Sequence, residues 1–81
     1  MLYAACLEIF KSITAPDISS VPGVTSPKAC QDICANDSAC THFTYILPEP
    51  VTGDLALTCH LKSADTPKED KQGVVSGAKA C

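Results

Sequence analysis

The sequence predicts a small α+β domain, stapled by disulfide bonds, in which one helix packs on an antiparallel sheet. The 81 residues include six cysteines, and an even number of cysteines in a short chain is typical of a disulfide framework in a secreted protein. One segment carries the signals of a helix, and several others alternate as strands with short connections. A chain of this length buries little surface on folding, so covalent cross-links such as disulfides are needed for stability.

The first predicted strand covers residues 6–13, which are apolar and rich in β-formers. Residues 14–23 contain two prolines and a glycine, so we expect a loop there. A short extended piece at residues 18–21 lies within this loop. The loop leads from the first strand to the helix.

The clearest helix covers residues 26–36. Ser26 is a good N-cap, and the proline after it suits the first helical position, where its missing N–H costs nothing. Asn36 is expected to take the left-handed conformation that ends many helices. Lys28 and Asp32, four residues apart, should form a favourable pair. Another face collects the side chains that should point to the sheet: Ala29, Cys30, Ile33 and Cys34.

Residues 40–47 alternate as a strand, and Phe43 and Tyr45 mark one of its faces as the core face. Residues 55–62 predict a further strand with its leucines and Cys59 inward. Residues 63–72 are polar and predict a loop, and a short last strand follows. The side chains expected on the outward faces are His42, Thr44, Thr58, His60 and Lys62.

Six cysteines allow fifteen pairings, and the predicted elements favour one set. Cys30 and Cys34 point the same way from one helix, so they are poorly placed to bond to each other. A tight turn brings Cys34 to Cys40, whereas Cys59 lies on a core face and is a natural partner for Cys30. The two cysteines left over are those at the ends, Cys6 and Cys81.

Zinc binding is the alternative use of these cysteines. Structural zinc sites favour paired knuckles in which two cysteines lie two to four residues apart. The chain has one such pair, and the two terminal cysteines would be left without a role. Disulfides are therefore favoured over the zinc ligand set Cys30, Cys34, Cys40, Cys59, His42 and His60.

Several motifs in order resemble the PAN/apple module. They are Ser26-Pro27-Lys28-Ala29-Cys30-Gln31-Asp32-Ile33-Cys34, Cys40-Thr41-His42-Phe43-Thr44-Tyr45, Cys59-His60-Leu61-Lys62, and Gly73-Val74-Val75-Ser76-Gly77 followed by Cys81. Such modules occur in plasma prekallikrein, coagulation factor XI and the microneme adhesins of apicomplexan parasites, and the chain is most similar to the adhesin branch. The resemblance covers residues 6–81 and leaves residues 1–5 as a tail or linker. It implies a five-stranded antiparallel sheet cradling one helix, with the disulfides Cys6–Cys81, Cys30–Cys59 and Cys34–Cys40.

Composition and charge exclude several classes of partner. The six basic residues are all lysines, and the net charge is −3. Without arginine, the chain lacks side chains that form bidentate hydrogen bonds to phosphate and sulfate. This argues against nucleic-acid binding and against a strong heparin site. No apolar run is long enough to enter and cross a membrane, and residues 1–5 lack the pattern of a signal peptide. We therefore expect one module of a longer secreted protein.

No motif predicts catalysis, a cofactor or a metal. His42 and His60 have no nucleophile and acid at the spacing of a known catalytic motif. Glu49 and Asp54 are paired carboxylates, but a chain this small is not expected to form the deep cleft that glycoside hydrolysis needs. The remaining acidic cluster lacks the spacing of an EF-hand: Asp65, Glu69 and Asp70. Asn36-Asp37-Ser38 matches the acceptor pattern for N-glycosylation, although the same residues also suit a plain turn.

The chain is therefore expected to be a non-catalytic recognition module that binds a protein or a glycan. Loops are the candidate binding surfaces, because the core side chains are committed to packing. The resemblance to microneme adhesins implies a tandem array, release from the microneme organelle to the parasite surface, and a role in host-cell attachment. A passive spacer and a small protease inhibitor are the alternatives. The candidate loops are Thr14–Thr25, Pro48–Asp54 and Ser63–Gln72.

Overall fold

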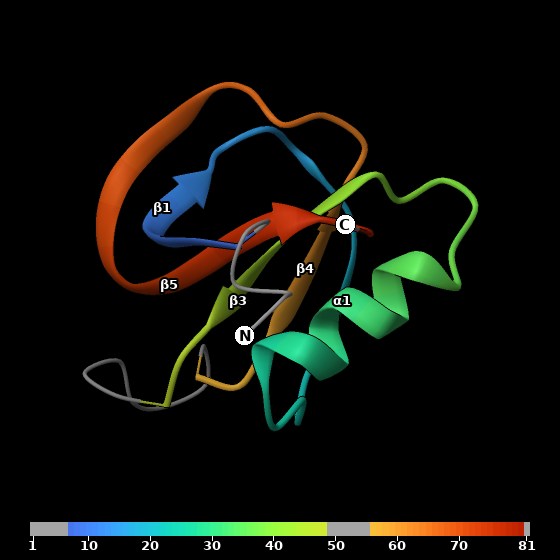
Figure 1. Cartoon of the computed structure of the whole chain (residues 1–81), viewed down its shortest axis with the longest axis horizontal. Coiled ribbons are helices and arrows are strands. Elements are labelled where there is room, and N and C mark those ends of the chain that lie inside the picture. The colour runs from blue at the N-terminus through green and yellow to red at the C-terminus, as the bar shows by residue number, and fades with distance from the viewer. Residues whose placement is uncertain (1–6, 49–55, 81) are drawn as a thin grey trace.

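The computed structural model describes residues 7–48 and 56–80. These residues form one helix and a five-stranded antiparallel sheet of order β1-β5-β3-β4-β2 (Figure 1). The fold class and the sheet predicted from the sequence and the family resemblance are confirmed. The elements are β1 (Leu7–Ile13), β2 (Asp17–Val21), α1 (Pro27–Ala35), β3 (His42–Ile46), β4 (Cys59–Lys62) and β5 (Lys68–Ala78).

The helix α1 begins where the sequence predicts. The backbone N–H of Ala29 donates to Ser26 Oγ at 3.1 Å, so the N-cap satisfies a donor that the helix itself cannot. The predicted pair on the solvent side is present, with Lys28 Nζ 2.5 Å from Asp32 Oδ1. Both partners of this pair are exposed, so its contribution to stability is small.

The end of α1 differs from the prediction. Asn36 has a φ of −90°, outside the left-handed region. Its backbone N–H donates to the carbonyl of Asp32 at 3.1 Å, and the N–H of Asp37 donates to the carbonyl of Cys34 at 3.0 Å. The chain thus leaves the helix through successive tight turns, which satisfy the last carbonyls without a left-handed residue. These turns return the chain to Cys40, whose sulfur bonds to Cys34.

One face of the sheet packs against α1 and holds the main core. Phe43, Tyr45, Cys59 and Leu61 are almost completely buried there, as the strand alternation predicts. The Tyr45 hydroxyl donates to the carbonyl of Val24, and burial raises the pKa of this phenol. The sequence pattern of β3 and β4 therefore identified the helix-facing side correctly.

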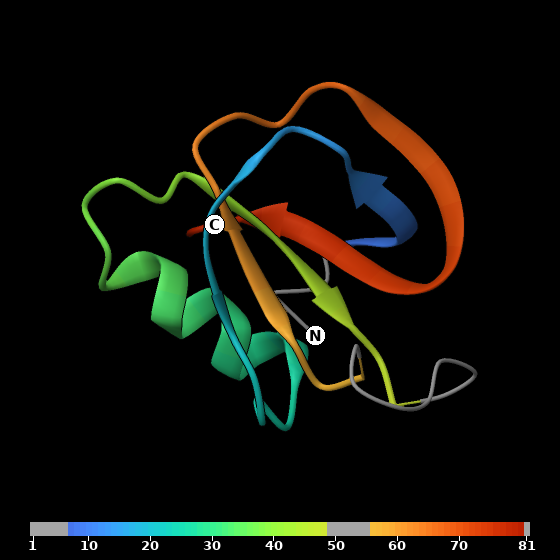
Figure 2. The same ribbon diagram turned by 180° about the vertical axis from the view of Figure 1, so that it is seen from behind.

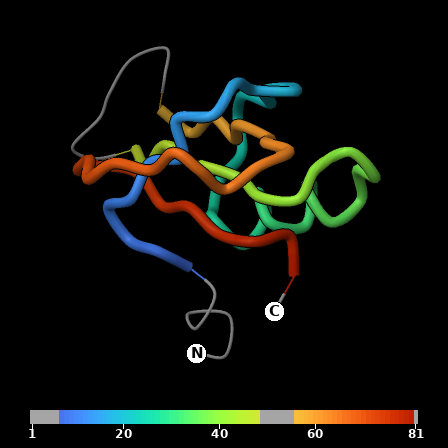
Figure 3. Tube along the Cα trace, turned by 90° about the horizontal axis from the view of Figure 1, so that it is seen from above, coloured from blue at the N-terminus to red at the C-terminus, as the bar shows by residue number. Residues whose placement is uncertain are grey.

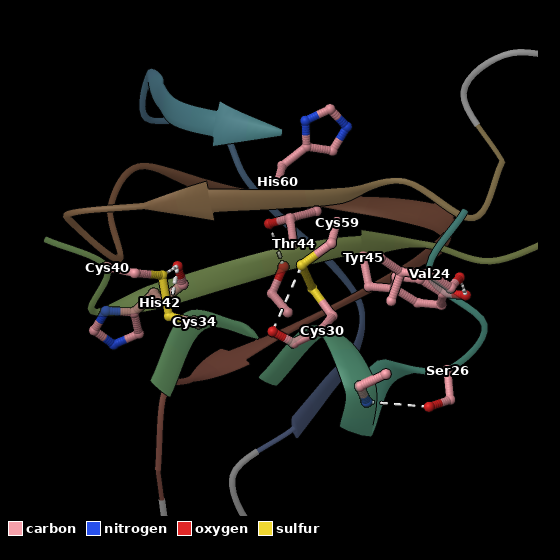
Figure 4. Close-up of a disulfide and its surroundings, with 12 residues drawn as sticks. Val24, Ser26, Cys30, Cys34, Cys40, His42, Thr44, Tyr45, Cys59 and His60 are labelled. Atoms are coloured by element: carbon pink, nitrogen blue, oxygen red, sulfur yellow. Dashed lines mark hydrogen bonds between the residues drawn. A yellow bond between two sulfur atoms is a disulfide. The ribbon is translucent and has the colours of Figure 1, made fainter. Parts of the chain in front are cut away.

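Two disulfides fasten α1 to the sheet in this core (Figure 4). Cys30 bonds to Cys59 on β4, and Cys34 bonds to Cys40 at the approach to β3. All four cysteines are fully buried. They are two of the three pairs that the family resemblance implies. The third pair, Cys6–Cys81, lies outside the described residues, although β1 starts and β5 ends on the same side of the molecule (Figure 3).

The opposite face of the sheet is covered as well, which the sequence did not predict. The chain between β1 and β2 crosses this face (Figure 2), and residues 13–17 are called the strap below. The N–H of Ile13 donates to Thr44 Oγ1 at 3.1 Å, and Lys62 Nζ donates to the carbonyl of Ala15 at 2.7 Å. Thr44 and Lys62, both expected to face outward, are therefore 3% and 7% exposed.

The last strand is longer than predicted. Residues 68–72 belong to β5, although their charged sequence predicts a loop. These residues form a strand because they pair with β1. In this pairing Lys11 lies opposite Asp70, and Ile13 lies opposite Lys68. Gly73, with a φ of 86°, lies between the two stretches of β5 that pair with β1, residues 68–70 and 75–77. This bend explains the wide arc of β5 in Figure 1.

The fourth strand is shorter than predicted. It starts at Cys59, because Leu57 has a φ of 61° and residues 56–57 form a turn. The N–H of Leu57 donates to the carbonyl of Ile46, and the N–H of Ile46 donates to the carbonyl of Thr58. Leu55, which we predicted to point inward, lies outside the described residues.

Candidate functional site

The strap divides its face of the sheet into two cavities. The larger, of about 300 Å³, is called the strap cavity. The smaller, of about 230 Å³, is called the end cavity. Ile13 lines both and so separates them. The strap cavity is lined by side chains from β1, the strap, β3, β4 and β5: Ser12, Ile13, Thr14, Asp17, Thr44, Ile46, His60, Lys62, Glu69 and Lys71.

A charged cluster stands at one side of the strap cavity. Asp17, the first residue of β2, accepts from Lys62 Nζ at 2.5 Å through Oδ1. Its other oxygen, Oδ2, lies 2.9 Å from His60 Nδ1. The Lys62 side chain is 8% exposed, that of His60 21% and that of Asp17 40%. Asp17 thus joins a buried cation to a half-buried imidazole.

The alternation of β4 explains how these groups come together. Residues 60 and 62 point to the same side of the strand, while Cys59 and Leu61 point to the core. Figure 4 shows His60 on the side of β4 that faces away from the disulfide. Asp17 is opposite Lys62 in the β2–β4 pairing, because the register shifts by one residue between Asp17 and Ser19, and this brings the carboxylate to the lysine.

The cluster sets the charge state of Asp17. Partial burial on its own would raise the pKa of this carboxyl, but hydrogen bonds from Lys62 and His60 outweigh it and hold the pKa below its usual value. Asp17 is therefore ionised at neutral pH. An ionised carboxylate only accepts hydrogen bonds, so His60 must carry its proton on Nδ1. The other ring nitrogen, Nε2, has no hydrogen-bond partner among the described residues.

Acid should weaken the strap through Asp17. Because the pKa of Asp17 is lowered on folding, its contribution to stability is present above the unfolded pKa, near 4, and is lost as the pH falls through the folded value. We expect the melting temperatures of wild type and Asp17→Asn to differ at pH 6 and to converge as the pH falls below the folded pKa of Asp17. Thermal unfolding followed by circular dichroism across this range measures the difference. A difference in melting temperature that stays constant down to pH 2 would contradict this dependence of stability on the ionisation of Asp17.

The end cavity holds a looser set of charges. His42 Nε2 lies 3.9 Å from Asp65 Oδ2, which is too far for a hydrogen bond. Lys68 Nζ lies 2.9 Å from Glu8 Oε1, and both of these side chains are substantially exposed. No described charged side chain of the end cavity is both buried and hydrogen-bonded to two protein groups, as Lys62 is. The strap cavity is therefore the stronger candidate for a binding site.

The predicted loops contribute unequally to these cavities. Thr14–Thr25 supplies the strap and Asp17, and Ser63–Gln72 supplies Glu69 and Lys71 through the part that is strand. Residues 49–54 of the third loop lie outside the described residues, and with them Glu49 and Asp54. Asp70 pairs with Lys11, whose pKa the Asp70 hydrogen bond raises. Asn36 is exposed at the end of α1, and its glycosylation remains a prediction.

The sequence placed Asp17 in a candidate loop but did not single it out, and it did not predict Thr44 and Lys62 as site residues. The available signal was the pair His60 and Lys62 on one face of β4, because two cationic or titratable side chains on one strand face call for an anion nearby. It pointed to no particular carboxylate, because the partner lies 43 residues away from His60.

The described residues contain no group of three or more histidines, cysteines or acids that could hold a metal ion. The four described cysteines of the zinc alternative are all in disulfides. Among the described residues, no helix is both long enough and apolar enough to span a membrane.

Comparisons with known proteins find similarity to PAN and apple domains. The sequence pattern of the PAN domain family matches residues 6–81. The structure is similar to the A5 domain of Toxoplasma gondii microneme protein 4, solved as a complex with lacto-N-biose, with a TM-score of 0.75 and 20% identity over 94% of this chain and 99% of that chain. At this identity the likeness concerns the fold alone.

Two further solved structures are similar. The two N-terminal apple domains of Toxoplasma gondii microneme protein 4 give a TM-score of 0.65 and 31% identity, over 90% of this chain and 44% of that chain. A PAN module from Eimeria tenella gives a TM-score of 0.60 and 26% identity, over 94% of this chain and 80% of that chain. No curated protein matches the sequence.

Proposed function

The chain belongs to the PAN domain family, and from that premise we propose that it is a non-catalytic module that binds a saccharide in the strap cavity. The observation that carries the proposal is the Asp17–His60–Lys62 cluster beside this cavity. A sugar hydroxyl both donates and accepts hydrogen bonds, so it suits a wall that offers fixed acceptors and donors. The lacto-N-biose complex of the A5 domain, which has the same fold, supports a saccharide as the ligand class.

The rigidity of the cluster supports binding rather than packing alone. Its side chains are held by the sheet register and by the strap, so little side-chain entropy is lost when a ligand binds. The cavity volume of about 300 Å³ is at the lower end for small-molecule sites. No aromatic side chain of the described residues lines the cavity, so a single module should bind weakly. Weak sites gain avidity when several modules engage one surface.

A binding role fits an extracellular adhesive protein. We infer that the module works as one of a tandem array in a protein released from the microneme organelle, where it assists attachment to a host cell. The similarity to microneme protein 4 and to the Eimeria module supports this setting. Two buried disulfides also suit an oxidising compartment.

The Asp17–His60 pair does not support hydrolysis. A histidine that acts as a base needs a nucleophile at its free nitrogen. No described hydroxyl or thiol forms a hydrogen bond with His60 Nε2. The free nitrogen is therefore available to a ligand.

Replacing His60 should weaken saccharide binding. We expect wild type to bind neutral glycans that end in lacto-N-biose on a glycan array, and His60→Ala to lose at least about tenfold in affinity, because it removes the free acceptor. His42→Ala is the matched control, since His42 lines the end cavity. Equal binding by wild type and His60→Ala would overturn this site. Absence of glycan binding by wild type, displayed in multivalent form, would leave the spacer or the protease inhibitor, which a protease panel distinguishes.

A further inference from the structure

The charges around the strap cavity point to the kind of saccharide that it takes. We propose, on the basis of the proposed function, that the cavity selects uncharged saccharides over acidic ones and that Asp17 is the residue that sets this selectivity. Acidic saccharides here are those that carry a carboxylate or a sulfate. The inference names the ligand class of the same site and assigns a role to a residue that packing alone does not require.

The cavity has no net charge to attract an anion. Its charged lining side chains are two lysines and two carboxylates, which balance when His60 is neutral. Glu69 and Lys71 lie on the exposed part of β5, where solvent screens them. Among the described residues, the only buried cation is Lys62. The electrostatic interaction of an anionic ligand with the cavity therefore depends on the groups that surround the Lys62 ammonium.

The Lys62 ammonium is already committed to partners within the protein. It donates to Asp17 Oδ1 at 2.5 Å and to the carbonyl of Ala15 at 2.7 Å. A unit negative charge at that distance cancels most of its field at the cavity. A carboxylate or sulfate entering the cavity would lose its hydration and find no uncompensated buried cation among the described residues, which is costly. It would also be repelled by Asp17 itself.

His60 adds an acceptor where an anion would need a donor. Because Nδ1–H is donated to Asp17, the lone pair of Nε2 is free to accept. A sugar hydroxyl can donate to this lone pair, whereas an ionised carboxylate or sulfate has no proton to give. Asp17 therefore acts twice, by cancelling the charge of Lys62 and by fixing the tautomer of His60. Both effects favour an uncharged ligand.

The substitution that tests this role is Asp17→Asn. The amide keeps the size of the carboxylate and an oxygen that accepts from Lys62, but it removes the negative charge. Lys62 is then left without a balancing anion, so the variant should gain affinity for acidic saccharides. Glu69→Gln is the matched control, because it removes one negative charge from the same lining at an exposed position.

The probes are lacto-N-biose and the same disaccharide carrying a sialic acid or a sulfate group, each titrated into the folded module and followed by NMR. For wild type we expect the neutral probe to bind at least about tenfold more tightly than the acidic probes. For Asp17→Asn that ratio should fall by about tenfold or reverse, whereas for Glu69→Gln it should change by less than about twofold.

The outcomes separate this inference from the proposed function. If wild type binds neutral and acidic probes equally, the selectivity is wrong while the saccharide site stands. If Asp17→Asn and Glu69→Gln change the ratio equally, the selectivity is general charge repulsion and Asp17 has no special role. If no probe binds to wild type or to either variant, the proposed function falls and the selectivity with it. The wild-type ratio needs no variant, so a failure of Asp17→Asn to fold still leaves the selectivity open to refutation.

Discussion

Loss of the Cys30–Cys59 disulfide should remove a large part of the stability of this domain. The bond joins residues 29 apart in sequence, and loop-closure entropy for such a loop is worth about 3.6 kcal/mol. Domains of this size are stable by only about 5–10 kcal/mol. We therefore expect Cys30→Ala with Cys59→Ala to lower the free energy of unfolding by about 4 kcal/mol, because the bond also fastens α1 to β4 within the main core.

The second disulfide is the matched comparison. Cys34 and Cys40 are 6 residues apart, so the same model gives about 2.4 kcal/mol. Urea unfolding of the two double variants, followed by circular dichroism, measures both losses. A larger loss from the Cys34–Cys40 pair would contradict this ranking, as would a Cys30–Cys59 variant as stable as wild type.

Truncating Ile13 should destabilise both the fold and the candidate site. Ile13 is 2% exposed and lies between the two cavities. Ile13→Ala creates a void that the surrounding strands cannot fill completely, so we expect a loss of about 3 kcal/mol. The strap should loosen as well, and lacto-N-biose should bind several-fold more weakly to the fraction that remains folded.

Ile9→Ala is the control on the same strand. Ile9 is 65% exposed, so its truncation should change the free energy of unfolding by less than about 0.5 kcal/mol. Urea unfolding and an NMR titration of both variants measure the two effects. Equal stabilities of Ile13→Ala and Ile9→Ala would show that the strap is not packed as described here.

Local signals in the sequence predicted the helix-facing half of the molecule. Ser26 and the proline after it mark the start of α1, and Phe43 and Tyr45 mark the buried face of β3. The i, i+4 spacing of Cys30 and Cys34 directs both sulfurs to the sheet. Each of these inferences depends on neighbours within a few residues, which is the range over which sequence patterns are informative.

The other half depends on contacts between distant residues. Alternation shows that His60 and Lys62 share a face, but not that a strap from the start of the chain covers it. Residues 68–72 are charged, and only their pairing with β1 makes them a strand. Asn36 keeps a negative φ because the turns that follow are closed by a disulfide, a constraint that helix-end preferences alone do not include.

The most direct test of the account is to map the binding site by NMR. Lacto-N-biose is titrated into the ¹⁵N-labelled module, and chemical-shift changes are recorded for every assigned backbone amide. The largest changes are expected around the strap cavity, at residues 13–17, Thr44, His60 and Lys62. Changes centred on the exposed side of α1, or on the end cavity around His42 and Asp65, would contradict it.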